Sequence, residues 1–302
     1  MIILLDHDFR FFGASRYLKF LHGELLKRGS SVAYLIPGPT DEVPDYTLYD
    51  QDSLLSIIHR LDPRLIYVNS MNPIVYHHLG EIQKYNTIFH SHEAASPILP
   101  DLVVSESIAG RYRETVKIQK PFLPVPKIDE IYRYSRQDIM NTKITLGMCG
   151  EVSDRKNFNL FSIVARLFPQ YMFIWVGGDR DEIIHHNFYL YKYTKCPYSF
   201  FRSFDYLLFT GADDPCPYVI LENIILETPI LLFRNSILTR HPLEFVKYLD
   251  RELDIRSMIR SIYLFVCEKK KQNISDSGYR YIKDNYSSCQ VAIQAIIEKC
   301  DF

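Results

Sequence analysis

The sequence predicts an α/β protein made of two successive Rossmann-like domains. Its length of 302 residues exceeds the usual size of a single domain. Short apolar runs alternate along it with longer helical patterns, which is typical of parallel sheets covered by helices. Near the middle, Pro121, Pro124 and Pro126 interrupt this alternation. We expect a connector there, because proline cannot donate to a sheet and restricts the residue before it.

The first half contains five expected strands, each apolar on both faces, as strands buried between two helix layers must be. These strands are Ile2–Leu5, Val32–Ile36, Leu65–Val68, Thr87–His90 and Leu102–Val104. Between the first two, Leu18, Leu21 and Leu25 recur at helical spacing over Ala14–Arg28, and Gly29 provides a stop. The pattern indicates a right-handed βαβ unit at the start of the chain.

The second half repeats the alternation after a polar stretch that ends near Lys143. Its expected elements are the strands Thr145–Cys149, Met172–Val176, Tyr206–Phe209 and Ile230–Phe233 and the helices Asn159–Leu167 and Pro217–Leu226. We place a hinge at residues 121–142 and the two domains at residues 1–135 and 136–302. The last helix, residues 288–302, is expected to pack back on the N-terminal domain.

The overall composition excludes several classes of protein. A net charge of −1 offers nothing that attracts nucleic acid. The six cysteines form no C-x-x-C pair, so we expect no zinc site, no disulfide framework and a reducing compartment. No apolar stretch approaches the ~20 residues of a spanning helix, which predicts a cytoplasmic protein. The run Lys269–Lys271 indicates a solvated helix end, with a peripheral membrane contact as the alternative.

Two loops have the residues of an anion site. In the first, Gly13 opens a helix directly after the first strand, which brings backbone amides and the positive helix end toward a phosphate. In the second, Gly147–Asn157, a strand ends in a glycine-containing loop that carries Arg155 and Lys156. These cations would neutralise a diphosphate leaving group. A plain tight turn and a surface Arg–Lys pair are the respective alternatives.

The most informative segment runs from Phe209 to Glu222, where a buried strand enters an acidic loop bounded by prolines. Pro217 suits the first turn of the next helix, whose amides, including those of Tyr218 and Val219, form a further anion site. Asp214 lies in the loop and Glu222 in the helix, with seven residues between them, so both carboxylates can meet hydroxyls of a sugar or a ribose. The alternative is that Asp214 caps the helix and Glu222 is solvated.

These motifs together resemble the retaining glycosyltransferases of family 4, which have the GT-B fold. This resemblance implies two Rossmann-like domains that face each other across a cleft. The family signature is two acidic residues separated by seven, after a D-P-x-P pattern that here reads Asp214-Pro215-Cys216-Pro217. The resemblance implies that Asp214 contacts the donor sugar and Glu222 the ribose. It also implies that the N-terminal domain binds the acceptor and the C-terminal domain the donor.

Two positions depart from the family pattern. Phe12 replaces the first glycine of the pair that ends at Gly13. In the basic motif, Gly150 and Lys156 match, but Glu151 occupies the arginine position. We infer that Arg155 supplies the missing charge, and that Glu151 turns away, toward solvent or a basic partner.

Phe89–Glu93 resembles the family strand that ends in a histidine facing the donor sugar. We align His92 with that histidine and keep His90 as the alternative, although a structural histidine is the commoner case. The resulting catalytic set is Asp214, Arg155, Lys156 and His92. The resulting donor-binding set is Gly13, Gly150, Cys216, Pro217, Tyr218, Val219 and Glu222.

The resemblance implies transfer from a nucleoside-diphosphate sugar to an unidentified acceptor, with retention, without a divalent metal and without a cofactor. Its partners would be the nucleotide-sugar donor and the acceptor, not nucleic acid. Two rival functions use the same fold, a non-hydrolysing sugar-nucleotide epimerase and a catalytically silent nucleotide-sugar-binding protein. A nicotinamide dehydrogenase is disfavoured because G-x-G-x-x-G is absent.

Overall fold

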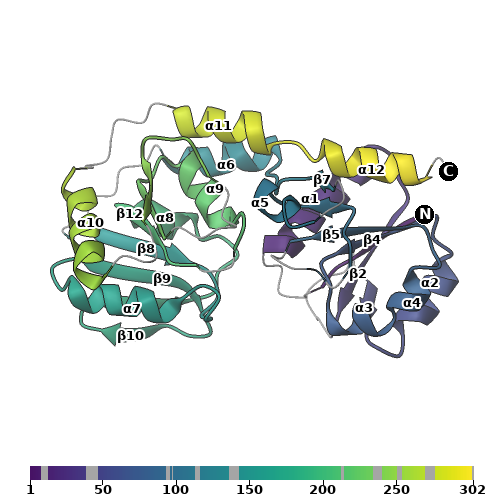
Figure 1. Ribbon diagram of the computed structural model, residues 1–302, viewed down its shortest axis with the longest axis horizontal. Helices are drawn as coiled ribbons and strands as arrows, with labels where there is room; N and C mark the ends of the chain where they lie inside the picture. Colours follow the sequence, from purple (N-terminus) through teal and green to yellow (C-terminus); the bar gives the residue numbers. More distant parts are fainter. Residues whose placement is uncertain are drawn as a thin grey trace. The chain divides into compact units, whose positions relative to one another are not determined.

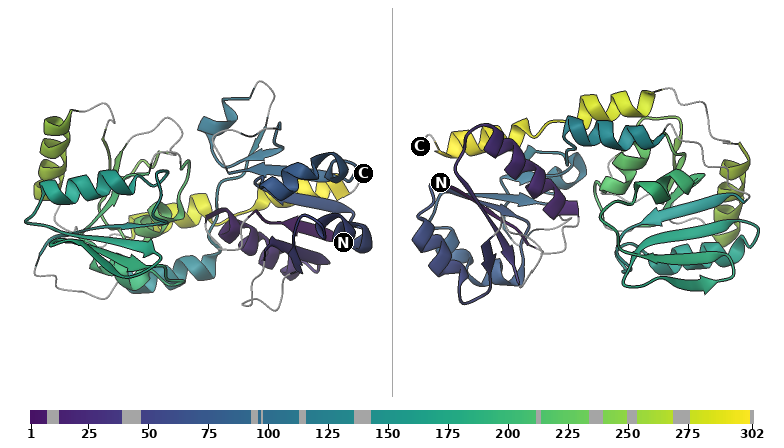
Figure 2. Two further views of the ribbon diagram at one scale, coloured as in Figure 1. Left: turned by 90° about the horizontal axis from the view of Figure 1, so that it is seen from below. Right: turned by 180° about the vertical axis from the view of Figure 1, so that it is seen from behind.

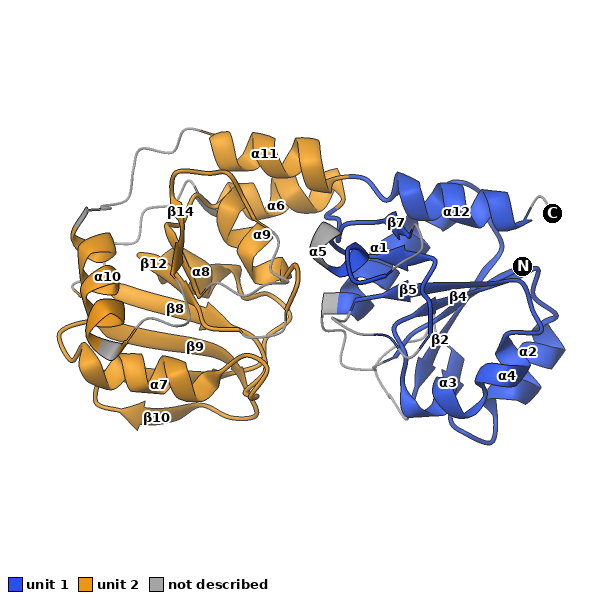
Figure 3. Ribbon diagram, in the orientation of Figure 1, with its two compact units in different colours: residues 1–123, 288–302 blue, residues 124–287 orange. Residues whose placement is uncertain are grey.

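The computed structural model shows two compact units, each built on a parallel sheet (Figure 1). It describes residues 1–7, 13–38, 47–92, 96, 98–112, 116–135, 143–211, 214–233, 240–249, 254–268 and 276–300. Unit 1 comprises residues 1–123 and 288–302, and unit 2 comprises residues 124–287 (Figure 3). Both are α/β, as the alternation of apolar runs predicts.

Unit 1 contains a seven-stranded parallel sheet in the order β3-β2-β1-β4-β5-β6-β7. Its strands are β1 Ile2–Leu5, β2 Val32–Pro37, β3 Thr47–Tyr49, β4 Leu65–Asn69, β5 Thr87–Ser91, β6 Leu102–Val103 and β7 Lys117–Ile118. Its helices are α1 Gly13–Lys27, α2 Leu54–Leu61, α3 Pro73–His77, α4 Leu79–Ile82, α5 Glu106–Ala109 and α12 Gln290–Cys300.

The core of unit 1 follows from the apolar strands. All residues of β1, β4 and β5 are buried, because helices cover both faces of this part of the sheet. Ile3 and Leu5 of β1 belong to the core cluster that includes Leu54 and Ile58 of α2. The C-terminal helix α12 packs on β4 and β5, a placement visible in Figure 2. Its last turn is tied there by Arg64, whose Nη2 donates to the carbonyl of Cys300 at 2.8 Å.

Unit 2 contains a second seven-stranded sheet, in the order β10-β11-β9-β8-β12-β13-β14, in which only β10 runs antiparallel among the described strands. Its strands are β8 Thr145–Cys149, β9 Met172–Gly178, β10 Glu182–His185, β11 Phe188–Lys192, β12 Tyr206–Phe209, β13 Ile230–Phe233 and β14 Val246–Leu249. Its helices are α6 Val125–Ser135, α7 Phe158–Leu167, α8 Tyr198–Ser203, α9 Tyr218–Ile225, α10 Ile255–Glu268 and α11 Ser277–Tyr286.

The segment in which we placed the hinge contains a helix that the sequence analysis did not name. Residues 125–135 form helix α6. Pro126 lies in the first turn, where a missing amide proton costs nothing. Ile128 and Ile131, one turn apart, are fully buried, and α6 packs on α8, α9 and α11.

Among the described residues, no helix is both long enough and apolar enough to cross a membrane.

Candidate functional site

In unit 2, polar residues gather at the point where the strand order reverses. Strands β8 and β12 are neighbours, yet β8 continues along the chain to β9 on one side and β12 to β13 on the other. Ligands of open α/β sheets bind outside the carboxyl ends of the strands at such a switch point. Here Gly150 follows β8, and Thr210 follows β12.

Two glycines bring the backbone close together at this point. Gly150 and Gly177 have positive φ angles of 157° and 129°. A Cβ on Gly177 would lie 2.2 Å from the carbonyl oxygen of Gly150, so only glycine fits there. The indole Nε1 of Trp175 donates to that same oxygen at 2.8 Å. The loop after β8 is thus held firmly against β9.

Lys156 and Asp214, expected in one site from the sequence, form an ion pair through Nζ and Oδ2. Both side chains are largely buried, with 11% and 14% of their surface exposed. The backbone oxygen of Lys156 accepts a hydrogen bond of 2.8 Å from Thr210 Oγ1, and its aliphatic stem packs against Gly150. A cation and a carboxylate therefore meet across the switch point from two loops that lie 58 residues apart in sequence.

Arg155 lies differently from its neighbour. Its Nη2 pairs with Glu151 Oε1 at 3.1 Å, and 49% of the arginine side chain is exposed. Arg155 is thus itself the basic partner toward which Glu151 turns. Exposed pairs of this kind contribute little to stability, so the contact leaves both side chains able to move.

Helix α9 begins beside this pair in sequence, at Tyr218, with Pro217 as its N-cap. No side chain caps it, and its first turn contains no acidic residue that would occupy the positive helix end. Cys216 and Val219 are buried. All eight helical residues are buried, because α6 and α11 cover the helix.

Glu222 lies inside this helix and is only 2% exposed, so it is not the solvated carboxylate that the alternative required. The hydroxyl of Tyr198 donates to its Oε1 at 3.4 Å. A buried carboxylate in an apolar helix is costly unless it has partners. Its role as ribose ligand stays a prediction.

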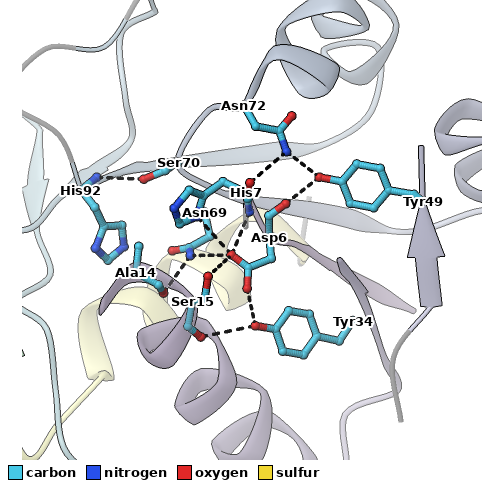
Figure 4. Close-up of polar contacts among 10 residues, drawn as sticks. All are labelled: Asp6, His7, Ala14, Ser15, Tyr34, Tyr49, Asn69, Ser70, Asn72 and His92. Atoms are coloured by element: carbon cyan, nitrogen blue, oxygen red, sulfur yellow. Dashed lines mark hydrogen bonds and ion pairs between the residues drawn. The ribbon is translucent and has the colours of Figure 1, made fainter. Parts of the chain in front are cut away.

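Unit 1 holds a second polar cluster, which the sequence reasoning missed (Figure 4). Asp6, directly after β1, is fully buried. Its carboxylate accepts hydrogen bonds from Tyr34 at 2.6 Å, Ser15 at 2.9 Å and the backbone amide of His7 at 2.8 Å. The hydroxyl of Tyr49 donates to the carbonyl oxygen of Asp6 at 2.6 Å, and burial raises the pKa of Tyr49, so this hydroxyl stays protonated. An acidic residue at the end of the first strand was the available signal.

The two histidines considered from the sequence both lie in unit 1. His90 is buried, and its Nδ1 lies 2.8 Å from the hydroxyl of Tyr67. Burial lowers the pKa of His90 to about 3, and burial together with His90 and His7 lowers the pKa of His92 well below its usual value. Both rings are therefore neutral at pH 7. Gly13 is the first residue of α1, while Phe12 lies outside the described residues.

No known family profile matches the sequence, and no curated protein matches it. Solved structures do match over nearly the whole length. Anabaena Alr3699/HepE in complex with UDP-glucose has a TM-score of 0.73 at 14% identity, over 99% of each chain. Sucrose-phosphate synthase from Thermosynechococcus elongatus has a TM-score of 0.71 at 11% identity, over 98% of this chain and 97% of that chain. A glycosyltransferase from Rickettsia africae ESF-5 has a TM-score of 0.64 at 11% identity, over 99% and 97%.

The fold is therefore that of the GT-B glycosyltransferases, with two Rossmann-like domains, as predicted. At identities this low the likeness establishes the fold and not the reaction. The structural neighbours are glycosyltransferases, and several of the matched structures contain UDP-glucose, or UDP and glucose.

Proposed function

We propose that this protein is a glycosyltransferase that moves a sugar from a nucleoside-diphosphate sugar to an acceptor. The observation that carries the proposal is the Lys156–Asp214 pair at the β8/β12 switch point, next in sequence to the uncapped start of α9. A lysine and a helix N-terminus are both suited to a diphosphate, and a carboxylate is suited to sugar hydroxyls. The matched structures that contain UDP-glucose support the same ligand class.

The chemistry needs negative charge to be stabilised as the sugar leaves. The bond between the anomeric carbon and the diphosphate oxygen breaks, and its electron pair goes to the diphosphate. The acceptor hydroxyl oxygen forms the new bond to the anomeric carbon, and its proton goes to the departing diphosphate oxygen. Lys156 neutralises that charge, and Arg155 adds a second cation after it leaves Glu151. Prearranged groups of this kind commonly contribute ~3–4 kcal/mol to the transition state each.

In the ligand-free protein, Asp214 holds Lys156 in position and keeps its charge compensated within a largely buried site. Donor binding then places the sugar hydroxyls on Asp214 and the diphosphate on Lys156, so that both charges keep a partner. The ion pair is thus a preformed arrangement of the binding groups, which lowers the reorganisation needed when the donor binds.

We further propose that transfer proceeds with retention, without a divalent metal and without a cofactor. In the donor complex Asp214 accepts hydrogen bonds from the sugar hydroxyls, and we assign no carboxylate as a covalent nucleophile, which favours attack from the same face as the departing phosphate. The charge of Lys156 and the positive end of α9 would stabilise the diphosphate, as a divalent metal does in other enzymes. Turnover should be unchanged after chelation by EDTA; a loss that only manganese restores would contradict this.

A titration with UDP, GDP and ADP tests the proposal, with the melting temperature of unit 2 as readout. A ligand at 100 times its dissociation constant stabilises the protein by about 2.7 kcal/mol. Lys156→Met should remove the shift, whereas Lys192→Met, at an exposed site at the end of β11, should keep it. Absence of any shift with all three nucleotides would overturn the proposal.

Product analysis separates the rival functions. A glycosyltransferase releases nucleoside diphosphate from a donor such as UDP-glucose, with water as a slow acceptor. An epimerase returns an altered nucleotide sugar, and a silent binding protein returns the donor unchanged.

A further inference from the structure

Tyr198 lies beside Glu222 inside unit 2. It is the first residue of α8 and is 1% exposed. Its hydroxyl donates to Oε1 of Glu222, which is itself 2% exposed in α9. The two residues lie 24 positions apart in the sequence, so the fold brings them together. A buried carboxylate is costly unless hydrogen-bond donors meet it, and a buried tyrosine hydroxyl likewise requires a partner.

The ring of Tyr198 is held by side chains of α6 and α8. The ring centroid of Tyr134 lies 5.5 Å away, and that of Phe201 lies 6.0 Å away. The Nζ atom of Lys127 lies 4.7 Å from the Tyr198 centroid, within the range of a cation–π contact. A ring packed in this way has little freedom to turn, so the direction of its hydroxyl is set before any ligand binds.

The contact restrains the carboxylate of Glu222. The last torsion of a glutamate side chain is broad, so without a hydrogen-bond donor the plane of the carboxylate would rotate. The distance of 3.4 Å is at the long end for a hydrogen bond between two oxygens. We therefore expect the contact to contribute little to the stability of unit 2 and to act mainly on the orientation of the carboxylate.

We propose that Tyr198 is a positioning residue that sets the selectivity of the donor site for ribonucleotides over deoxyribonucleotides. Resting on the proposed glycosyltransferase function, Glu222 accepts hydrogen bonds from the ribose hydroxyls of the nucleotide. Tyr198 turns the carboxylate toward these hydroxyls, so less freedom is lost when the ribose binds. A nucleotide that lacks the hydroxyls gains nothing from this orientation.

The test compares the binding of UDP and 2′,3′-dideoxy-UDP by calorimetry, and of GDP and ADP and their dideoxy forms if UDP does not bind. We call the dissociation constant of the dideoxy form divided by that of the ribose form the ribose ratio. In the unaltered protein this ratio should be about tenfold or more, because the lost hydrogen bonds go to a charged acceptor. Tyr198→Phe keeps the ring and should lower the ratio about threefold, with the affinity for the dideoxy form unchanged.

Two further replacements of Tyr198 separate the hydrogen bond from the packing of the ring. Replacement by 4-aminophenylalanine keeps an N–H donor and should restore the ribose ratio. Replacement by 4-methylphenylalanine fills the same volume without a donor and should lower the ratio as Tyr198→Phe does. This pair gives the answer even where Tyr198→Phe folds poorly.

A variant of Glu222 shows whether Tyr198 acts through it. Glu222→Gln should lower the ribose ratio, and adding Tyr198→Phe should lower it no further, because both changes affect one contact. Tyr206→Phe is the matched control. It removes a hydrogen bond of 2.8 Å from another buried tyrosine to the carbonyl of Val266, and it should leave the ratio unchanged.

The outcomes separate this inference from the function on which it rests. If UDP binds with a ribose ratio that Glu222→Gln lowers and Tyr198→Phe does not, the role of Tyr198 is wrong and the donor site survives. A ratio near one in the unaltered protein, or equal losses for both nucleotides in Tyr198→Phe, would likewise overturn the inference. If no nucleoside diphosphate binds the unaltered protein, the glycosyltransferase function is wrong and the inference falls with it.

Discussion

Removing the Lys156–Asp214 ion pair, one partner at a time and then together, probes the donor site without any ligand. Lys156→Met keeps much of the aliphatic stem, and Asp214→Asn keeps the shape of the carboxylate. The two side chains are only 11% and 14% exposed, so each single change leaves one poorly solvated charge without its partner. Removing one partner of a buried ion pair lowers the free energy of unfolding by about 3–5 kcal/mol. Because both side chains keep some exposure, we expect a loss near the lower limit, about 3 kcal/mol.

Urea unfolding monitored by tryptophan fluorescence measures the free energy of unfolding of unit 2 separately from unit 1. Trp175 is the single tryptophan of the chain, is fully buried in β9 and is bonded to Gly150. With a slope of about 2 kcal/mol per molar urea, a loss of 3 kcal/mol lowers the midpoint by about 1.5 M. Arg155→Met, at the exposed pair with Glu151, is the matched control and should cost below about 0.5 kcal/mol.

The double variant is decisive, because it removes both charges. We expect it to lose about 2 kcal/mol less than the sum of the single variants. Additive losses, or an unchanged midpoint in either single variant, would refute the reasoning and show that the two groups do not pair in solution.

Three further predictions follow from the two units. Glu222→Ala should weaken UDP binding by about 1.5–3 kcal/mol in calorimetry; an unchanged affinity in a folded variant would remove Glu222 from the site. Gly177→Ala should shift the emission of Trp175 and reduce soluble yield, because its Cβ would collide with the Gly150 carbonyl; native emission would contradict this. Unit 1 should lose stability as the pH falls below 6.5. In the unfolded state the ring of His90 takes up a proton, whereas in the folded state burial lowers the pKa of His90 to about 3 and the ring stays neutral. Each such histidine adds about 1.4 kcal/mol per pH unit, and His90→Asn should flatten the thermal melting profile accordingly.

The sequence predicts the elements with strong apolar patterns and misses those without them. Strands β1, β8, β12 and β13 have the predicted bounds, since each is a continuous apolar run buried on both faces. Edge strands are short or polar, so β3 and β7 give no comparable signal. Helix α6 was hidden by prolines that the first turn of a helix tolerates.

For the site, the sequence analysis put Lys156 and Asp214 in one catalytic set from two separate motifs, and the structure places the two side chains in contact. It gave no indication that Arg155 would pair with Glu151, because the direction of an exposed side chain depends on local geometry. The sequence analysis also missed the polar cluster around Asp6 in unit 1, since Asp6, Asn69 and His92 become neighbours only through the strand order. Residues that come from different strands of a sheet to form one site have no regular spacing in the sequence.

The return of the chain to unit 1 has a consequence for how the protein is made. Residues 124–287 are a continuous segment that contains every strand of the second sheet, whereas unit 1 needs residues 288–300 to complete it. During synthesis on the ribosome, unit 2 has its whole sequence available first, and unit 1 waits for its last helix. Until α12 has been made, it does not cover β4 and β5, and apolar surface of unit 1 stays accessible to chaperones.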